Sequence, residues 1–320
     1  MRIYRHLSEL PPHDGPVIAT IGNFDGVHLG HQGVIAEVIE RARFLRGRSI
    51  AITFDPHPTR VLRPESAAKL ITPTPRKLEL LAATGLDATL VLQFTHELCH
   101  TSARDFAANV LLGALHITEI HEGENFRFGY HAEAGIEGLE ALGHEFGFAT
   151  VIYAPRTLRG AAVSSSRVRE LLTGGDVSGA RALLGQPFAI DSTPAAGRGY
   201  GTRYAVPTIN LAAYPELLPA NGVYVTTLRI GDGPEAETFE AVTNVGNRPT
   251  FGADSFAVES HLLNFHPVDL TERTPLRLTF LRRLRAEQRF PSTEALRDQI
   301  RIDVTRAKRY FELCRHTVSI

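Results

Sequence analysis

The chain has 320 residues, more than twice the roughly 150 residues of a typical domain, so its length predicts two domains. Hydrophobic residues make up 43% and charged residues 22%, values close to the globular average that exclude disordered, collagen-like and coiled-coil proteins. The formal net charge of −1 gives no overall field for a polyanion, so we expect no nucleic-acid partner and only local phosphate sites.

Cysteine use and hydropathy predict an intracellular, cytoplasmic protein. Cys99 and Cys314 are too far apart in the sequence for a disulfide framework or a Cys-x-x-Cys metal site, which fits a reducing compartment. The first ten residues carry charge without an apolar core, and no apolar run reaches the ~18 residues of a membrane span, so we expect neither a signal peptide nor a membrane partner. Of the 14 histidines, 11 lie in residues 1–150, which indicates two chemically different halves.

Strands and helices alternate in the first half of the chain. Short β-branched or apolar runs predict strands at residues 17–21, 50–54, 88–94, 117–120 and 149–153. Apolar residues at three- and four-residue steps predict helices over residues 34–45 and 106–114. This alternation predicts an α/β domain with a Rossmann-like, doubly wound parallel sheet, whose ligands bind beyond the carboxyl ends of the strands.

The pattern changes after Gly185 from alternating strands and helices to successive strands. Two short helical stretches, residues 165–172 and 176–184, precede this glycine, and strand-like runs without long helices follow it at residues 222–230, 239–246, 257–265 and 276–284. This succession predicts a small antiparallel β-barrel. The helical spacing of residues 293–313, with Ser292 as the N-cap, predicts a closing α-helix. We therefore expect domains of residues 1–184 and 185–320.

The segment between the first predicted strand and the first helix is suited to bind phosphate. Residues 22–31 read Gly-Asn-Phe-Asp-Gly-Val-His-Leu-Gly-His. His28 and His31 project the same way from a helix start, where free backbone N–H groups and the positive end of the helix dipole favour an anion. This predicts a nucleotide site, and the alternative is that the histidines only satisfy the helix end. No Walker-type loop occurs, which excludes a P-loop kinase.

Three further blocks follow the histidine segment along the chain. They read Phe-Asp-Pro-His-Pro at residues 54–58, Gly-Glu-Asn-Phe-Arg-Phe-Gly at 123–129 and Ser-Ser-Ser-Arg-Val-Arg at 164–169. Together, and in this order, the four blocks resemble the FMN adenylyltransferase module of bacterial bifunctional FAD synthetase/riboflavin kinases. The resemblance implies that the phosphate of FMN attacks the α-phosphorus of ATP and that pyrophosphate leaves, a reaction that mainly needs positioning and charge stabilisation.

The resemblance also implies roles for individual residues of this module. His28 and His31 would be the catalytic histidines that hold the ATP phosphates. The other implied ATP- and phosphate-binding residues are Gly22, Asn23, Asp25, Ser164, Ser165 and Arg167, and the residues at the border of the flavin or nucleotide are Asn23, Asn125 and Phe126. Asp25 would orient backbone or metal, with a turn aspartate as the alternative. His57 is expected to be a rigid loop element, with catalysis as the alternative.

A second set of motifs lies in the other half. Because strand side chains alternate, Thr208 and Asn210 of a Pro-Thr-Ile-Asn block share one face, where two neutral oxygens suit Mg²⁺ beside ATP phosphates. With residues 222–224, 244–251 and 258–263, this block resembles the riboflavin kinase module of the same family. The resemblance implies that Glu259 is the base on the ribityl hydroxyl and that Arg285 borders the flavin or nucleotide. The alternatives are a surface carboxylate for Glu259 and a solvated face for residues 282–289.

The combined resemblance predicts a cytoplasmic enzyme for two consecutive reactions. Residues 185–320 would make FMN from riboflavin and ATP, and residues 1–184 would make FAD from FMN and ATP, with Mg²⁺ as cofactor. The loop before Thr208 keeps Gly197 and Gly201 for ATP phosphates but has Ala205 and Val206 where relatives commonly have Gly and Phe. Residues 269–272 lack the Tyr-Gly pair usual there. These departures leave two alternatives, an FMN adenylyltransferase with a degenerate barrel and a flavin sensor without turnover.

Overall fold

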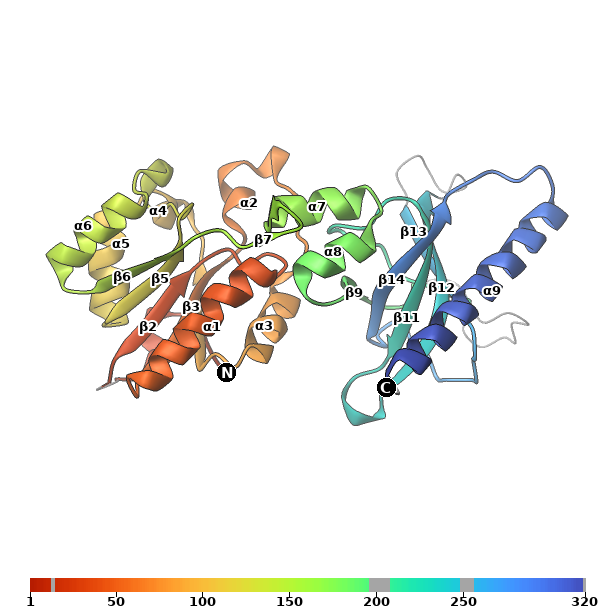
Figure 1. Ribbon diagram of the computed structural model, residues 1–320, viewed down its shortest axis with the longest axis horizontal. Helices are drawn as coiled ribbons and strands as arrows, with labels where there is room; N and C mark the ends of the chain where they lie inside the picture. Colours follow the sequence, from red (N-terminus) through yellow and green to blue (C-terminus); the bar gives the residue numbers. More distant parts are fainter. Residues whose placement is uncertain (13–14, 196–207, 248–255, 319–320) are drawn as a thin grey trace. The chain divides into compact units, whose positions relative to one another are not determined.

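The computed structural model describes residues 1–12, 15–195, 208–247 and 256–318 (Figure 1). The chain divides into two compact units, Met1–Ser165 and Ser166–Ile320. The predicted domain boundary at residues 184 and 185 stays a prediction.

A six-stranded parallel sheet forms the centre of the first unit. The strand order is β1-β4-β3-β2-β5-β6, and each neighbouring pair is parallel, which confirms the predicted doubly wound architecture. The strands are β1 (Arg2–Tyr4), β2 (Val17–Ile21), β3 (Arg48–Asp55), β4 (Ala88–Gln93), β5 (Glu119–Gly123) and β6 (Ala149–Tyr153). β2 and β6 have the predicted bounds, β5 starts two residues later than predicted, and β1 was not predicted.

Two apolar clusters hold helices on opposite faces of this sheet. The helices are α1 (Leu29–Phe44), α2 (Pro58–Leu62), α3 (Thr74–Ala83), α4 (His96–Cys99), α5 (Ala103–Phe106), a π-helix (Ala107–Ala114) and α6 (Ile136–Phe146), with 3₁₀ turns at Leu7–Glu9, Pro64–Ser66 and Tyr130–Ala132. α1 and α3 bury Ile35 and Leu81 in one cluster, and the π-helix and α6 bury Leu111 and Leu139 in the other. A hairpin of β7 (Thr157–Leu158) and β8 (Ala161–Ala162) follows β6.

The strand order reverses between β2 and β5. β2 continues to β3 and β4 on one side, whereas β5 and β6 lie on its other side. β2 pairs with β3 as far as Ile21 and Ile52, but its pairing with β5 ends at Ala19 and Ile120. The two strands therefore separate at their carboxyl ends, and such a switch point is where ligands bind in open α/β sheets.

The second unit contains a six-stranded antiparallel sheet in the order β10-β13-β12-β11-β14-β9. Two helices precede it, α7 (Ser165–Thr173) and α8 (Val177–Leu184), and its strands are β9 (Ala189–Ser192), β10 (Thr208–Asn210), β11 (Gly222–Ile230), β12 (Glu237–Asn247), β13 (Phe256–Leu262) and β14 (Leu276–Ala286). A short 3₁₀ turn, Gly233–Glu235, joins β11 to β12.

The two outer strands of this sheet meet. Pro194 and Leu211 form an antiparallel bridge, and the backbone N–H of Ala195 donates to the carbonyl oxygen of Asn210 at 2.8 Å. The bridge closes the sheet on itself, which confirms the predicted small antiparallel barrel.

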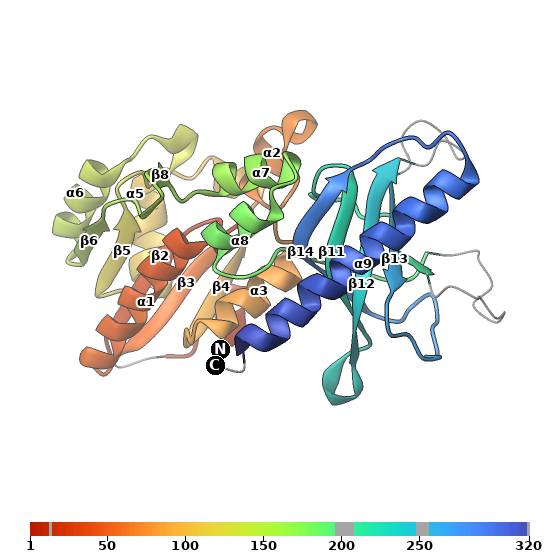
Figure 2. The same cartoon turned by 45° about the vertical axis from the view of Figure 1, so that its right-hand side comes forward.

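The closing helix α9 (Thr293–Val318) packs against one face of the barrel sheet, as Figure 2 shows. Ala307 and Phe311 pack on Val223 and Val242, and Ser292 caps the helix by accepting from the N–H of Ala295 at 3.2 Å, as predicted. The helix extends five residues beyond its predicted end at residue 313. Among the described helices, none is both long and apolar enough to cross a membrane.

Candidate active sites

The paired histidines lie at the start of α1. The backbone N–H of His31 donates to Nδ1 of His28 at 3.3 Å, and the two rings stack with centroids 3.6 Å apart. A Cβ at Gly30 would lie 3.1 Å from the His28 ring, so a glycine between the histidines permits this close approach. His28 therefore satisfies the helix end, the alternative role left open above, and its neutral ring carries the proton on Nε2.

Burial controls the charge of both rings. It lowers the pKa of His28 to about 4, and it lowers the pKa of His31 well below the usual value of 6.5, with further effects of the same sign from His28 and Lys77. Both histidines are therefore neutral at pH 7 in the unliganded chain. The buried Nδ1 of His31 has no hydrogen-bond partner among the described residues. The pair thus presents neutral N–H groups and one unsatisfied polar atom at the amino end of a helix.

The turn before α1 is held by Asp25. Phe24 and Val27 have φ values of 48° and 41°, a conformation that costs a non-glycine residue about 1–3 kcal/mol. Between them, the buried carboxylate of Asp25 accepts from the N–H groups of Ile71 at 3.1 Å and Thr72 at 2.9 Å. In these bonds Asp25 acts as a turn aspartate, the alternative role given in the sequence analysis. They connect the segment of residues 22–31 to the loop that contains Ile71 and Thr72.

Residues 164–169, the Ser-Ser-Ser-Arg-Val-Arg block, begin beside this turn. The hydroxyl of Ser165 donates to the carbonyl oxygen of Asp25 at 2.8 Å, and Ser164 precedes it in the same unit. Arg167 belongs to the second unit, where it pairs with Glu170 at 2.6 Å. The structure therefore brings Ser165 to the histidine segment.

A pocket of about 670 Å³ lies in the first unit, within the usual size range of small-ligand sites. Four predicted residues line it, Gly22, Asn23, Asn125 and Phe126. The other side chains that matter for its chemistry are the aromatic rings of Phe54, Phe94, Phe106 and Phe128 and the cationic or titratable groups of Arg63, Arg127 and His131. The pocket combines ring faces for a planar aromatic ligand with basic groups for an anion.

A smaller recess adjoins the same strand ends. Its polar lining comprises Asn23, Asp25, His57, Thr72, Thr74 and Lys77. His57 caps α2 by accepting from the N–H of Thr59 at 3.3 Å, which fits the expected rigid loop element. Lys77 is buried and was not among the predicted site residues, although its helical spacing with Leu78 and Leu81 places it on the buried face of α3.

The gap between β2 and β5 is filled by the buried side chain of Glu122. Its Oε1 accepts from the backbone N–H of Ile21 at 2.5 Å, in the place of the missing strand partner. Burial raises the pKa of this carboxyl well above its usual value. This side chain holds the carboxyl end of β2, where the 670 Å³ pocket begins.

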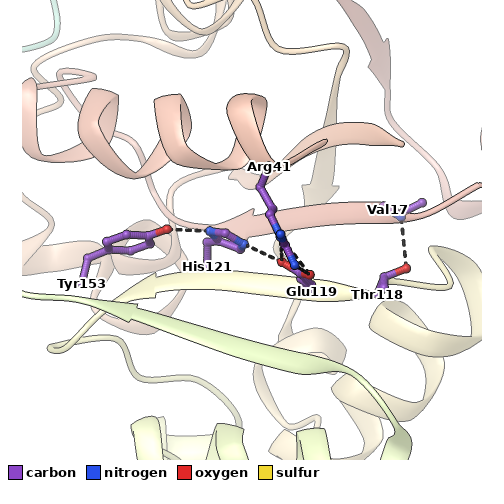
Figure 3. A network of polar contacts seen from close by, with 6 residues as sticks. All are labelled: Val17, Arg41, Thr118, Glu119, His121 and Tyr153. Atoms are coloured by element: carbon purple, nitrogen blue, oxygen red, sulfur yellow. Dashed lines mark hydrogen bonds and ion pairs between the residues drawn. The ribbon is translucent and has the colours of Figure 1, made fainter. Parts of the chain in front are cut away.

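A separate polar network binds β5 to its neighbours (Figure 3). Arg41 of α1 donates to the carboxylate of Glu119 through Nη2 at 2.7 Å and through Nε at 2.9 and 3.0 Å. His121 contacts Glu119 through Nε2 at 3.2 Å and the hydroxyl of Tyr153 through Nδ1 at 2.8 Å. The network connects α1, β5 and β6, and none of its members lines the 670 Å³ pocket.

The second unit has a pocket of about 470 Å³ on one face of its sheet. Thr208, Glu259 and Arg285 line it, so three of the predicted residues meet there. The strand register explains why these residues lie together. Residues paired across five neighbouring strands form one line, which runs Asn210, Glu259, Asn244, Val223 and Arg285. Side chains in such a line lie on the same face, which places Asn210 beside Glu259.

Two further side chains of this pocket were not predicted. His261 lies two residues after Glu259, on the same strand face and opposite Thr208. Period-two alternation could have identified it. Asp303 of α9 is buried and accepts from Nε of Arg285 at 2.9 Å, a contact that no local pattern encodes. Because Arg285 is bound in this way, the predicted solvated face of residues 282–289 does not include it.

Gly197 and Gly201, together with Ala205 and Val206, lie outside the described residues. Among the residues that the structure describes, no three His, Cys, Asp or Glu side chains are grouped so that they could hold a metal ion.

Two protein-family models match the chain. The FAD synthetase model covers residues 10–167, and the riboflavin kinase model covers residues 184–311.

Relatives and a solved structure cover nearly the whole chain. The bifunctional riboflavin kinase/FMN adenylyltransferase of Pseudomonas fluorescens is 35% identical over 96% of this chain and 97% of its own length. The enzyme of the same name from Escherichia coli is 32% identical over 98% of this chain and 99% of its own length. A crystal structure described as a macrolide-efflux protein from Streptococcus pneumoniae superposes with a TM-score of 0.83 over 96% of this chain and 98% of that chain. At 24% identity, this last likeness concerns the fold alone.

Proposed function

The chain belongs to the family of bifunctional riboflavin kinases/FMN adenylyltransferases, and from this membership we propose how its residues divide the two reactions. It phosphorylates riboflavin with ATP to give FMN, and it adenylylates FMN with ATP to give FAD and pyrophosphate. Riboflavin, FMN, FAD and ATP are its small-molecule ligands. The sequence-based prediction of both activities is confirmed, and nothing favours a barrel without kinase activity.

For adenylyl transfer, we assign the flavin of FMN to the 670 Å³ pocket. The observation that supports this most is that Asn23, Asn125 and Phe126 line one aromatic pocket at the switch point of the sheet. The rings of Phe126 and Phe128 stack with centroids 5.3 Å apart and offer a flat apolar surface to the isoalloxazine.

The ATP phosphates belong, in this proposal, at the amino end of α1. The N–H groups of the first helical turn and the neutral rings of His28 and His31 favour an anion there. An approaching phosphate favours protonation of the histidine pair, which supplies positive charge as negative charge builds up on the leaving pyrophosphate. Ser165 and Ser164 contribute hydroxyls from the last block, and Arg167 is proposed to add its guanidinium.

For riboflavin phosphorylation, we assign Glu259 as the base. It lies in the 470 Å³ pocket and on one sheet face with Asn210, so a ribityl hydroxyl bound in that pocket can give its proton to the carboxylate. Arg285 lines the same pocket and borders the flavin or nucleotide. Gly197 and Gly201 are proposed to approach the ATP phosphates.

Thr208 and Asn210 fit a Mg²⁺ ion that is bound mainly by ATP. Both carry neutral oxygens on one strand face, which suits a hard cation whose other ligands are phosphate oxygens and water. When bound, the ion neutralises charge on the β- and γ-phosphates. The side chains of Thr208 and Asn210 orient the nucleotide, and Glu259 takes the proton.

We also propose a cytoplasmic location. ATP is a cytoplasmic substrate, and both cysteines are free thiols, as expected in a reducing compartment.

Separation of products after incubation with riboflavin, ATP and Mg²⁺ tests this function. Formation of both FMN and FAD supports the full assignment. Formation of FAD only when FMN is added would favour the degenerate barrel, and formation of neither product would contradict both activities.

A further inference from the structure

Lys77 of α3 is a buried cation with three protein acceptors. Its side chain is almost fully covered, with 4% exposure. Nζ donates to the carbonyl oxygen of Asn23 at 3.2 Å, to the hydroxyl of Thr53 at 3.0 Å and to the carbonyl oxygen of Phe54 at 3.1 Å. A lysine ammonium has three N–H donors, so each of them has an acceptor within the protein.

The three acceptors belong to the carboxyl ends of two neighbouring strands. Asn23 follows β2, and Thr53 and Phe54 lie in the last three residues of β3. The hydroxyl of Thr53 also contacts the carbonyl oxygen of Asn23 at 3.4 Å, which completes a compact cluster. The side chains of Asn23 and Phe54 both line the 670 Å³ pocket. Lys77 therefore connects the two strand ends from which the pocket is built.

The charge of Lys77 matters because the neighbouring histidines are neutral. Burial lowers the pKa of Lys77 to about 8, while Asp25 and Asp55 act in the opposite direction, so the side chain is cationic at pH 7. Lys77 is also close enough to His31 to lower the pKa of that ring. In a region with little water, such a charge is only weakly screened.

A purely structural link between the strands would not need a cation. Burying an ammonium costs solvation free energy that a neutral donor such as a hydroxyl or amide would largely avoid. Unlike a neutral donor, a buried cation produces a positive electrostatic potential, which favours the phosphate groups proposed to bind at this edge of the sheet.

We propose that Lys77 is a positioning residue for adenylyl transfer, which holds Asn23 and Phe54 at the flavin pocket and adds a positive field on the phosphate side. The proposal rests on the function assigned above. Since its three donors are used within the protein, Lys77 acts through the strand ends and through its field, without touching the substrate.

The test replaces Lys77 in the full chain and follows both activities. Lys77→Met keeps length and apolar stem but removes the charge and donors, and we expect it to lower kcat for FAD formation from FMN by about 10- to 100-fold. Riboflavin kinase activity of the same preparation should stay within twofold, which shows that the loss is confined to the first unit. Arg76→Met, which removes a half-buried cation paired with Glu79 on the same helix, is the matched control and should leave both rates unchanged.

The pH dependence of FAD formation by the Lys77→Arg variant tests the proposal even if the Lys77→Met variant does not fold. Arginine retains its charge at all accessible pH values, so we expect FAD formation by this variant to persist above pH 8, where the wild-type rate declines as Lys77 loses its proton. The titratable groups around Lys77 are Asp25, Asp55, His31 and His57. Lys77→Arg keeps all four of these groups, so a difference between its pH profile and that of the wild type comes from residue 77 itself.

Two outcomes would overturn the proposal. The first is that the Lys77→Met variant forms FAD at the wild-type rate. The second is that the rate of FAD formation by the Lys77→Arg variant depends on pH in the same way as that of the wild type. Either result leaves the assigned function intact as long as the wild-type chain forms FAD. A wild-type chain that forms no FAD would instead contradict the assigned function.

Discussion

In the unit of residues 1–165 the candidate site lies beyond the ends of parallel strands, whereas in the unit of residues 166–320 the candidate site lies on the face of an antiparallel sheet. The first arrangement depends on loop backbone, which Lys77 and Glu122 hold from distant elements and which Asp25 joins to the loop of Ile71. The second depends on side chains such as Glu259 and Asn210, which the pairing of strands places side by side. A strand-face site is therefore encoded in short motifs, but a strand-end site also requires buried residues elsewhere in the sequence.

The largest expected effect concerns the strand-face site. Glu259→Gln removes the proposed base but keeps the shape of the side chain, so FMN formation should fall by about 10²- to 10⁴-fold. FAD formation from added FMN should not change, because the two sites are in different units. Both rates can be measured by separating the flavin products, and unchanged kinase turnover would contradict the role of Glu259.

The next effect concerns the strand-end site. His31→Ala should slow FAD formation by about 10²- to 10³-fold, the scale on which one group that stabilises developing charge contributes. FMN formation should be spared. His144→Ala, which changes an exposed histidine of α6, is the control and should leave both rates as they are. Equal loss of both activities in His31→Ala would indicate misfolding.

A smaller effect tests whether the barrel site also depends on a distant element. Asp303→Asn weakens the bond between α9 and Arg285, and we expect the KM for riboflavin to rise by about tenfold, as for one charge-assisted hydrogen bond. Asp298→Asn on the exposed face of α9 is the matched control. A KM equal to that of the wild type would mean that the sheet face alone forms the kinase site.

The smallest effect concerns the free energy of unfolding. Because the folded-state pKa of Glu122 is raised above 4.5, its protonation stabilises the folded chain fully below that pH, and the contribution is lost as pH rises through the folded-state pKa. Glu122→Gln keeps a neutral acceptor for Ile21 and should be relatively more stable as pH increases, by at most about 1.4 kcal/mol per pH unit. Urea unfolding at several pH values measures this, and a pH-independent difference would show that the acid is not neutral in the folded chain.

Much of the fold follows from periodicity. Alternating and apolar runs predicted the bounds of β2, β6 and β11, because each is a continuous pattern between turn residues. β1 could not be predicted in this way, since it has three residues and gains its conformation from pairing with β4. The order of the strands, and therefore the switch point beside β2, depends on crossovers that the pattern does not encode.

The residues of the candidate sites likewise fall into those that local sequence patterns predict and those that only long-range contacts reveal. Thr208 and Glu259 could be assigned from short blocks, and strand register brings them to one pocket. Lys77 could not be assigned, because its partners are two carbonyl oxygens and a hydroxyl that carry no sequence signature of their own. The pair of Arg285 and Asp303 joins a strand to a helix, and such long-range contacts become visible only in three dimensions.

The pairing of β1 with β4 has a consequence for folding during synthesis. Arg2 pairs with Ala88, which is 86 residues later in the sequence, whereas β2 and β3 can pair much sooner. At about 5–20 residues per second, β1 must wait roughly 4–17 seconds for its partner to be made. Once β4 has formed against β3, its outer edge is open to strands of other chains until β1 docks, so we expect slow docking of β1 to favour aggregation of nascent chains.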